Sequence, residues 1–179
     1  TFVIVNPDGT IRHKLVGGGE GEQFIERVKE SFDDNKALGA LDAKYNSGNR
    51  DKAFLSQYAK AMVANYDPNA KAIVDELLKI STDEEKLSED YWFIFGNSEL
   101  SPKDSEAAKF LTANRSKFND VIGKEKVDNR LREGLFREIL MVIAGRGQNT
   151  DAKRLDAIGR EVKALKLSNE KTLLASLAI

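Results

Sequence analysis

Apolar residues recur three and four positions apart along almost the whole chain after Asn35. This spacing puts them on one face of an α-helix, so it predicts a mainly helical fold. The helices are expected over residues 20–32, 37–45, 51–66, 70–80, 101–118, 124–144, 150–165 and 168–179, with a short helical turn at 81–85. Short turns separate them, which favours an irregular array of antiparallel helix pairs. The second half of 124–144 is apolar almost all round, so we expect it at the centre of the helical part.

The first 34 residues follow a different pattern. Residues 2–5 and 10–16 are rich in apolar and β-branched side chains and flank Asn6-Pro7-Asp8-Gly9. Proline presets φ and glycine accepts a positive φ, so this pattern predicts a β-hairpin. Three glycines then lead into the helix over 20–32. We therefore expect two domains: residues 1–34, with the hairpin and first helix, and residues 35–179, with the helical array.

A lone hairpin is only marginally stable in water. We therefore expect this one to cover its apolar face with the helical region or with a second copy of the chain, which makes a homo-oligomer through the hairpin an open alternative. Exposure of all three of Val3, Val5 and Leu15 would contradict this expectation. The chain begins inside an apolar run, without a methionine, as we expect of a mature or trimmed fragment.

The order of these N-terminal residues resembles the C-terminal end of a thioredoxin fold. The matching segments are Thr1-Phe2-Val3-Ile4-Val5, Asn6-Pro7-Asp8-Gly9, Ile11 to Leu15, Val16-Gly17-Gly18 and Glu22 to Val28. In that family a strand, a tight turn, a second strand with glycines and a closing helix follow one another in this way. The helical remainder resembles the extension found in some bacterial cell-envelope thioredoxin-like proteins. The resemblance implies a periplasmic or cell-envelope location, and the cytoplasm stays open.

The redox centre of the thioredoxin family is a Cys-x-x-Cys motif, and this chain contains no cysteine. The resemblance thus implies a parent protein that is a thiol–disulfide oxidoreductase, but it transfers no catalytic residue to these positions. Without cysteine the chain has no disulfide, no thiol nucleophile and no thiolate metal site. With a single histidine as well, we expect no metal and no cofactor. The first functional hypothesis is a redox-inactive fragment whose helical part is a scaffold or a protein-interaction module.

A second hypothesis is a stand-alone helical module that binds proteins or peptides. The helices over 51–66 and 70–80, joined by Asp67-Pro68-Asn69, resemble a tetratricopeptide unit in length and turn. Four aromatic residues between 91 and 95 cannot all face one side of a helix, so one or two of them can reach a groove. The candidate partner-binding residues are Tyr58, Tyr91 and Trp92. An enzyme with an unrecognised site is the third hypothesis.

Other patterns favour ordinary structural roles. His13 alternates with Ile11 and Leu15 on its strand, so we interpret it as a packed or edge histidine. The glycines before the helix at 20–32 lack the phosphate-loop spacing. Acidic pairs and the basic residues Arg130, Arg132, Lys153 and Arg154 are interpreted as solvated helix faces, and an anion or nucleic-acid surface is the minor alternative for the basic residues. The net charge of -1 gives no basic field for a nucleic-acid partner, and no apolar run is long enough to span a membrane.

Overall fold

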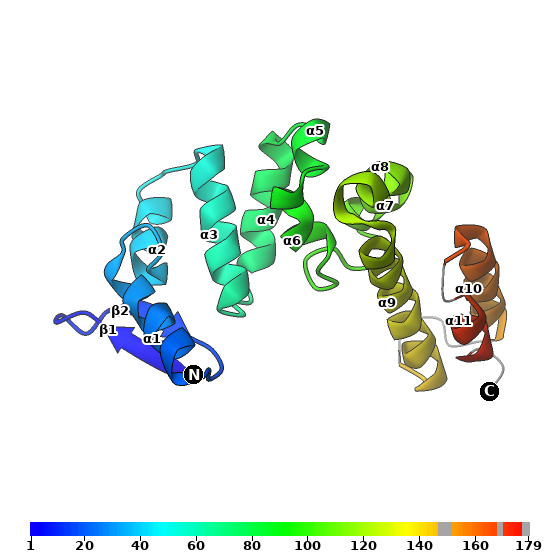
Figure 1. The fold of residues 1–179 in the computed structure, drawn as a ribbon, viewed down its shortest axis with the longest axis horizontal. Coiled ribbons are helices and arrows are strands. Elements are labelled where there is room, and N and C mark those ends of the chain that lie inside the picture. Colours follow the sequence, from blue (N-terminus) through cyan, green and yellow to red (C-terminus); the bar gives the residue numbers. More distant parts are fainter. Residues whose placement is uncertain (147–151, 168–169, 177–179) are drawn as a thin grey trace. The chain divides into compact units, whose positions relative to one another are not determined.

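The computed structural model describes residues 1–146, 152–167 and 170–176 (Figure 1). The fold is mainly helical, as predicted: within these residues a two-stranded hairpin is followed by eleven α-helices and two short 3-10 helices. The chain divides into two compact units, Thr1–Thr82 and Asp83–Ile179. Each is described by itself.

The hairpin pairs β1 (Phe2–Val5) with β2 (Ile11–Leu15) in antiparallel register, with Phe2 opposite Leu15. The turn between them forms as its residues dictate. The backbone N–H of Gly9 donates to the carbonyl of Asn6 at 2.9 Å, and Gly9 has a φ of 84°, which glycine adopts without steric cost. The side chain of Asp8 accepts from both the backbone and the hydroxyl of Thr10.

Helix α1 (Gly21–Lys29) and the 3-10 helix η1 (Glu30–Phe32) return the chain along the hairpin. The rings of Phe24 and Phe2 meet edge to face with their centroids 4.9 Å apart. From the same helix, Arg27 donates through Nη2 to the carbonyl of Val16 at 2.8 Å. This aromatic contact to β1 and the hydrogen bonds of Arg27 to the carbonyls of Val16 and Gly18, just after β2, therefore fix the first helix to the hairpin.

Helix α2 (Leu38–Asn46) packs directly on β2, and a glycine makes this possible. A Cβ on Gly39 would overlap the carbonyl oxygen of Ile11 and lie 3.0 Å from that of Arg12, so helix and strand meet backbone to backbone. The boundary predicted after residue 34 therefore falls inside the first compact unit, because hairpin and α2 share a core.

The hairpin covers one of its two faces on the helical region, as expected. Leu15 is 2% exposed and His13 is buried beside α2, whereas Val3 and Val5 are 51% and 58% exposed on the opposite side. Side chains alternate across a strand, so one face of the hairpin is packed and the other is open.

Helices α3 (Lys52–Ala64) and α4 (Ala70–Ile80) form a helical hairpin and complete the first unit (Figure 1). Their facing side chains are buried in one core: Phe54, Leu55, Tyr58, Ala59 and Met62 from α3, and Ile73, Val74 and Leu77 from α4. The predicted helix ends here agree with the structure within two residues, because an Asp-Pro-Asn turn separates two strongly periodic segments.

The second unit begins with short elements: α5 (Asp83–Lys86), η2 (Glu89–Tyr91), α6 (Trp92–Phe95), α7 (Glu106–Ala113) and α8 (Arg115–Ile122). The single helix predicted over 101–118 is wrong, because the structure breaks it at Asn114 and starts it later. The Asn114 side chain donates to the carbonyl of Phe110 at 3.1 Å, and Ser105 caps α7 by accepting from Ala108. Phe118 lies at the centre of an aromatic cluster with Trp92, Phe95 and Phe110.

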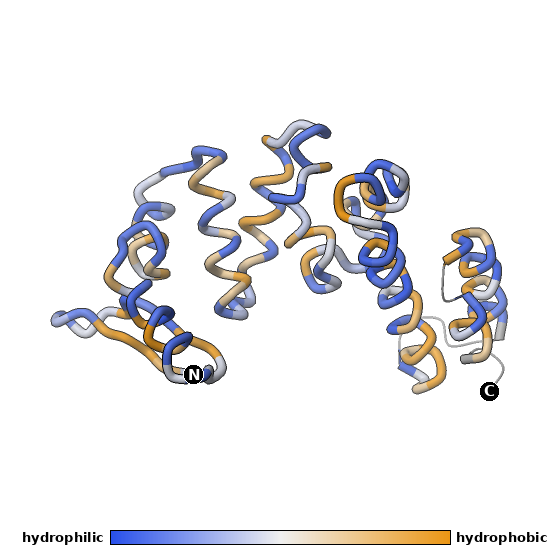
Figure 2. Tube along the Cα trace, in the orientation of Figure 1, coloured by the Kyte–Doolittle hydropathy of each residue, from blue (hydrophilic) through white to orange (hydrophobic). Residues whose placement is uncertain are grey.

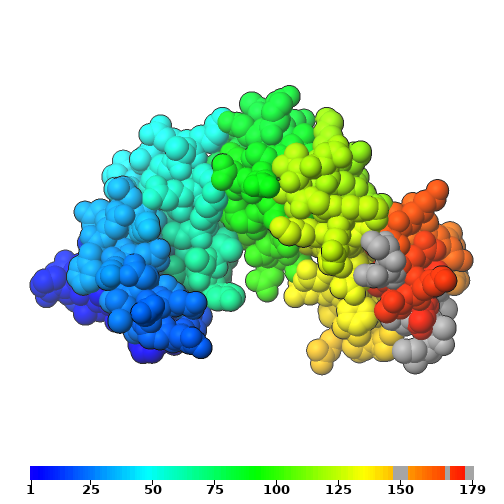
Figure 3. Space-filling model, in the orientation of Figure 1, coloured from blue at the N-terminus to red at the C-terminus, as the bar shows by residue number. Residues whose placement is uncertain are grey.

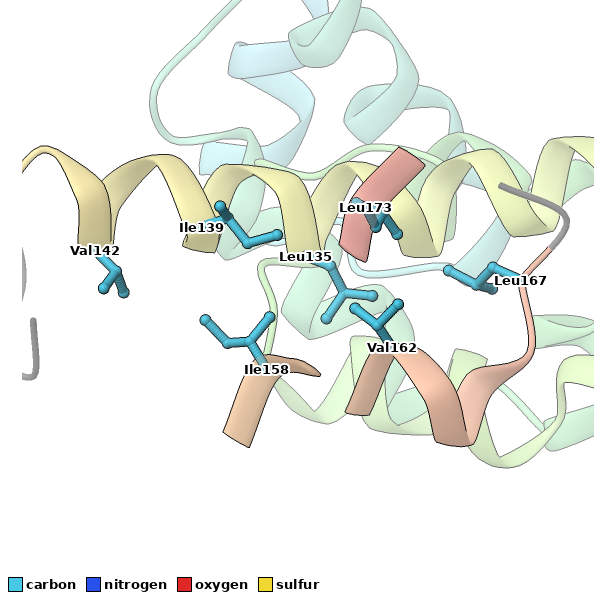
Figure 4. Close-up of a cluster of buried hydrophobic side chains, with 7 residues drawn as sticks. All are labelled: Leu135, Ile139, Val142, Ile158, Val162, Leu167 and Leu173. Carbon is cyan, nitrogen blue, oxygen red and sulfur yellow. The ribbon is translucent and has the colours of Figure 1, made fainter. Parts of the chain in front are cut away.

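Helices α9 (Lys124–Ile143), α10 (Ala152–Leu165) and α11 (Glu170–Ser176) complete the second unit. Figure 4 shows their shared core. It contains Leu135, Ile139 and Val142 from α9, Ile158 and Val162 from α10, Leu167 just after α10, and Leu173 from α11. Only one face of the second half of α9 is covered in this way. The prediction that this segment lies at the centre of the helical part is therefore wrong, because another face of it is exposed.

Candidate interaction surfaces

The three candidate binding residues do not form one site. Tyr58 belongs to the first unit, and Tyr91 and Trp92 belong to the second. Tyr58 is buried between neighbouring aromatic rings, and its hydroxyl donates to Oδ1 of Asp42 at 2.6 Å. Burial first, and then this hydrogen bond to a carboxylate, raise the pKa of the Tyr58 hydroxyl well above its usual value. The geometry gives Tyr58 a structural role in the core.

In the second unit, Tyr91 is buried and Trp92 is half-buried. The Trp92 ring packs against Phe118 with 6.0 Å between centroids. Its nitrogen-bearing edge lies over Gly96, where a Cβ would come within 2.9 Å of Nε1. Gly96 therefore lets the indole lie flat on the backbone, with part of the ring left accessible. Of the three candidates, Trp92 is the one placed to meet a partner.

Trp92 lines an open pocket of about 520 Å³ between α6 and α9, together with Gly96, Lys126, Asn129, Arg130, Arg132 and Glu133. Sequence reasoning missed Lys126 and Asn129 as members of this site. A signal for them was present, because 126, 129, 130 and 133 recur three and four residues apart and so share one face of a helix. Three cationic side chains and one carboxylate line this pocket.

Arg130 corrects the interpretation of the basic residues as solvated helix faces. It is buried, and its guanidinium donates to the carbonyl of Phe95 at 3.0 Å, to the carbonyl of Ser101 at 2.5 Å and to the Ser101 hydroxyl at 3.0 Å. These acceptors are neutral, and burial lowers the pKa of the guanidinium. Arg130 therefore carries a buried positive charge that is hydrogen-bonded to neutral acceptors, with the charge of Glu133 nearby.

Arg132 contributes a second cation. Its Nε is buried and has no hydrogen-bond acceptor among the residues that the structure describes. The pocket's one carboxylate, Glu133, accepts a hydrogen bond from the Ser98 hydroxyl at 2.8 Å. Lys126 at the rim is exposed. The pocket is thus an electropositive hollow beside an aromatic ring.

Arg154, also expected on a solvated face, belongs instead to a charge cluster in the second unit. Lys103 lies 2.7 Å from Oε2 of Glu138 and 3.1 Å from Oε2 of Glu161, and Arg154 bonds the other oxygen of Glu138. Glu138 comes from α9, while Glu161 and Arg154 come from α10. The cluster joins these two helices and is structural.

Two exposed apolar surfaces remain. One is the open face of the hairpin, with Val3 and Val5. The other, here called the α9 stripe, consists of Phe136, Leu140 and Ile143, which are 44–50% exposed and lie three and four residues apart. Figure 2 shows the hydrophobic residues gathered in the second half of α9, and Figure 3 shows atoms of this segment, in yellow, at the surface.

Among the described residues, no group of three or more His, Asp or Glu side chains is arranged to hold a metal ion. No helix in the same residues combines the length and the apolar character that crossing a bilayer requires. Comparisons with protein-family models, with curated proteins and with solved structures find no match to this chain. The function is therefore argued from the surfaces themselves.

Proposed function

We propose that the chain is a redox-inactive protein-interaction module, the C-terminal part of a thioredoxin-like protein whose thiols lie outside these residues. The α9 stripe is the observation that carries the interaction role. Large apolar side chains at this spacing form a continuous exposed band, whereas the surface of a monomer ordinarily carries such residues singly. The stripe has the spacing with which one amphipathic helix packs on another.

A neighbouring face of α9, about 100° around the helix from the stripe, shows what such packing is like. There Leu135, Ile139 and Val142 are at most 7% exposed under α10 and α11. Burying the three stripe residues under a partner helix would remove a comparable set of side chains from water, at about 25 cal/mol for each Å² of apolar surface. The partner we propose is an amphipathic helix of another protein with its apolar face turned to α9.

The thioredoxin part of the proposal is supported by the element order. Strand, glycine turn, strand and packed helix follow one another in residues 1–29. Within the described residues β1 pairs only with β2, so one edge of this strand is free to extend a larger sheet. The open apolar face of the hairpin would be covered by the helices that flank such a sheet.

Photo-crosslinking tests the interaction role. Benzoylphenylalanine at Leu140 is expected to give one discrete adduct when the protein is irradiated in the cells that make it. The same group at Lys163, an exposed position on α10, is the matched control and is expected to give none. An absence of adducts at Leu140, or the same pattern from both positions, would contradict the proposal.

An insulin-reduction assay with dithiothreitol tests the redox part. The chain has no thiol to attack a disulfide, so turbidity is expected to develop at the background rate. Turnover above that rate in a preparation free of thioredoxin would refute it.

A further inference from the structure

The Trp92 pocket has an unbalanced set of polar groups. Arg130, Arg132 and Lys126 bring three positive charges to its walls, and Glu133 brings one negative charge. Arg132 keeps a buried Nε without an acceptor among the described residues, a state that costs free energy until an acceptor arrives. The buried charge of Arg130 adds to the same field, since its hydrogen bonds go to neutral carbonyls and the single carboxylate of Glu133 faces three cations.

The shape of the pocket restricts what kind of anion fits. It is open to solvent, and the half-buried Trp92 ring forms one wall, while the edge with Nε1 lies against the backbone of Gly96. An inorganic anion would contact the cationic side chains and would not need the ring. A carboxylate next to an apolar group uses both, because the carboxylate accepts from Arg132 and Lys126 while the apolar group packs on the indole.

We infer that the Trp92 pocket binds an acidic side chain of an extended peptide segment, with the apolar neighbour of that side chain on the Trp92 ring. The inference rests on the proposed protein-interaction role and names the chemistry of a contact separate from the α9 stripe. An arginine that is already partly desolvated forms a stronger pair with a carboxylate than an exposed arginine does, since less solvation is lost on binding.

The chain offers a built-in probe, because Trp92 is its only tryptophan. The ligand used is the blocked peptide acetyl-Leu-Glu-Glu-Leu-amide, and acetyl-Leu-Gln-Gln-Leu-amide is the matched neutral control. Titration of the Trp92 emission is expected to saturate with the acidic peptide, at an affinity at least about tenfold tighter than with the neutral one. The acidic peptide is also expected to bind more weakly at high salt.

Two variants locate the effect. Arg132→Gln is expected to weaken the affinity for the acidic peptide by about tenfold. Arg160→Gln removes an exposed arginine from α10 and is expected to leave this affinity unchanged. Circular dichroism checks that both variants keep the helical fold. Equal affinities for the two peptides, or an unchanged affinity in Arg132→Gln, would overturn the inference.

Inorganic phosphate tests whether the pocket is a peptide site or binds an adventitious ion only. If phosphate changes the Trp92 emission as strongly as the acidic peptide at the same concentration, the inference is wrong. The crosslinking at Leu140 is read independently. An adduct at Leu140 without binding of the acidic peptide overturns the pocket assignment alone, and peptide binding without an adduct overturns the role of the α9 stripe alone.

Discussion

The ring of His13 accepts a hydrogen bond from the backbone N–H of Leu38, with 3.1 Å between Nδ1 and the amide nitrogen. The bond links β2 to the first turn of α2, where backbone N–H groups lack helical partners. It requires an unprotonated Nδ1. The only histidine of the chain is therefore part of the joint between hairpin and helices.

The stability of the first unit is expected to fall as the pH decreases below about 6.5. Burial, more than the neighbouring charges, lowers the pKa of His13 from its ordinary value of 6.5. The unfolded chain then binds a proton before the folded chain does, so the stabilising contribution is complete above pH 6.5 and is lost as the pH falls toward the folded-state pKa. His13→Asn keeps an acceptor near Nδ1 but does not titrate. Urea unfolding followed by circular dichroism between pH 5 and 8 should show a smaller pH dependence in this variant; equal slopes in the two proteins would count against the assignment.

Gly39→Ala is expected to destabilise the first unit, although alanine usually favours a helix by about 1 kcal/mol over glycine. The added methyl group would overlap the carbonyl oxygen of Ile11, which belongs to backbone and cannot rotate away. We expect a loss of about 2 kcal/mol or more in the free energy of unfolding. Gly21→Ala is the control, because nothing lies within 4 Å of its Cβ position in α1. An unchanged or higher melting temperature for Gly39→Ala would refute the close contact.

Glu138→Gln is expected to lower the stability of the second unit by about 2 kcal/mol. Its carboxylate pairs with Lys103 and Arg154, and the Glu138 side chain is only 17% exposed, so its removal leaves two partly buried cations without their shared partner. The exposed pair of Lys109 and Glu106 in the same unit supplies the contrast, because Glu106→Gln should change stability by about 0.5 kcal/mol or less. Denaturant titrations followed by Trp92 emission report on the second unit. Similar shifts for the two substitutions would show that the charge cluster has no special role.

Phe118→Ala should destabilise the second unit by about 3–5 kcal/mol, because the ring is fully buried among Trp92, Phe95 and Phe110. The Trp92 emission of the folded variant should also shift to longer wavelength as water reaches the cavity. Phe136→Ala removes the same side chain from the exposed stripe, and we expect a change within about 0.5 kcal/mol. A cost at Phe136 equal to that at Phe118 would mean that the stripe is already covered within the chain.

The sequence predicted most of the elements and little of the site. Strong periodicity placed α3 and α4, and turn chemistry placed the hairpin, because these signals act within a few residues. The break at Asn114 was missed, since a side chain that bonds the preceding turn looks the same in the sequence as one on a helix surface. Arg130 was missed for a different reason. Its burial depends on the carbonyls of Phe95 and Ser101, about 30 residues away, and no local pattern specifies that meeting.

The second half of α9 also poses a problem of choice during folding. Two of its faces carry apolar residues and are similarly hydrophobic, so hydrophobic burial alone discriminates poorly between them as packing surfaces for α10 and α11. The charges beside one face remove that ambiguity. Glu138 lies next to Ile139, and only docking on that side lets Arg154 and Glu161 reach Glu138 and Lys103. Ion pairs that add modest stability thus specify which face of α9 is covered, and they leave Phe136, Leu140 and Ile143 exposed.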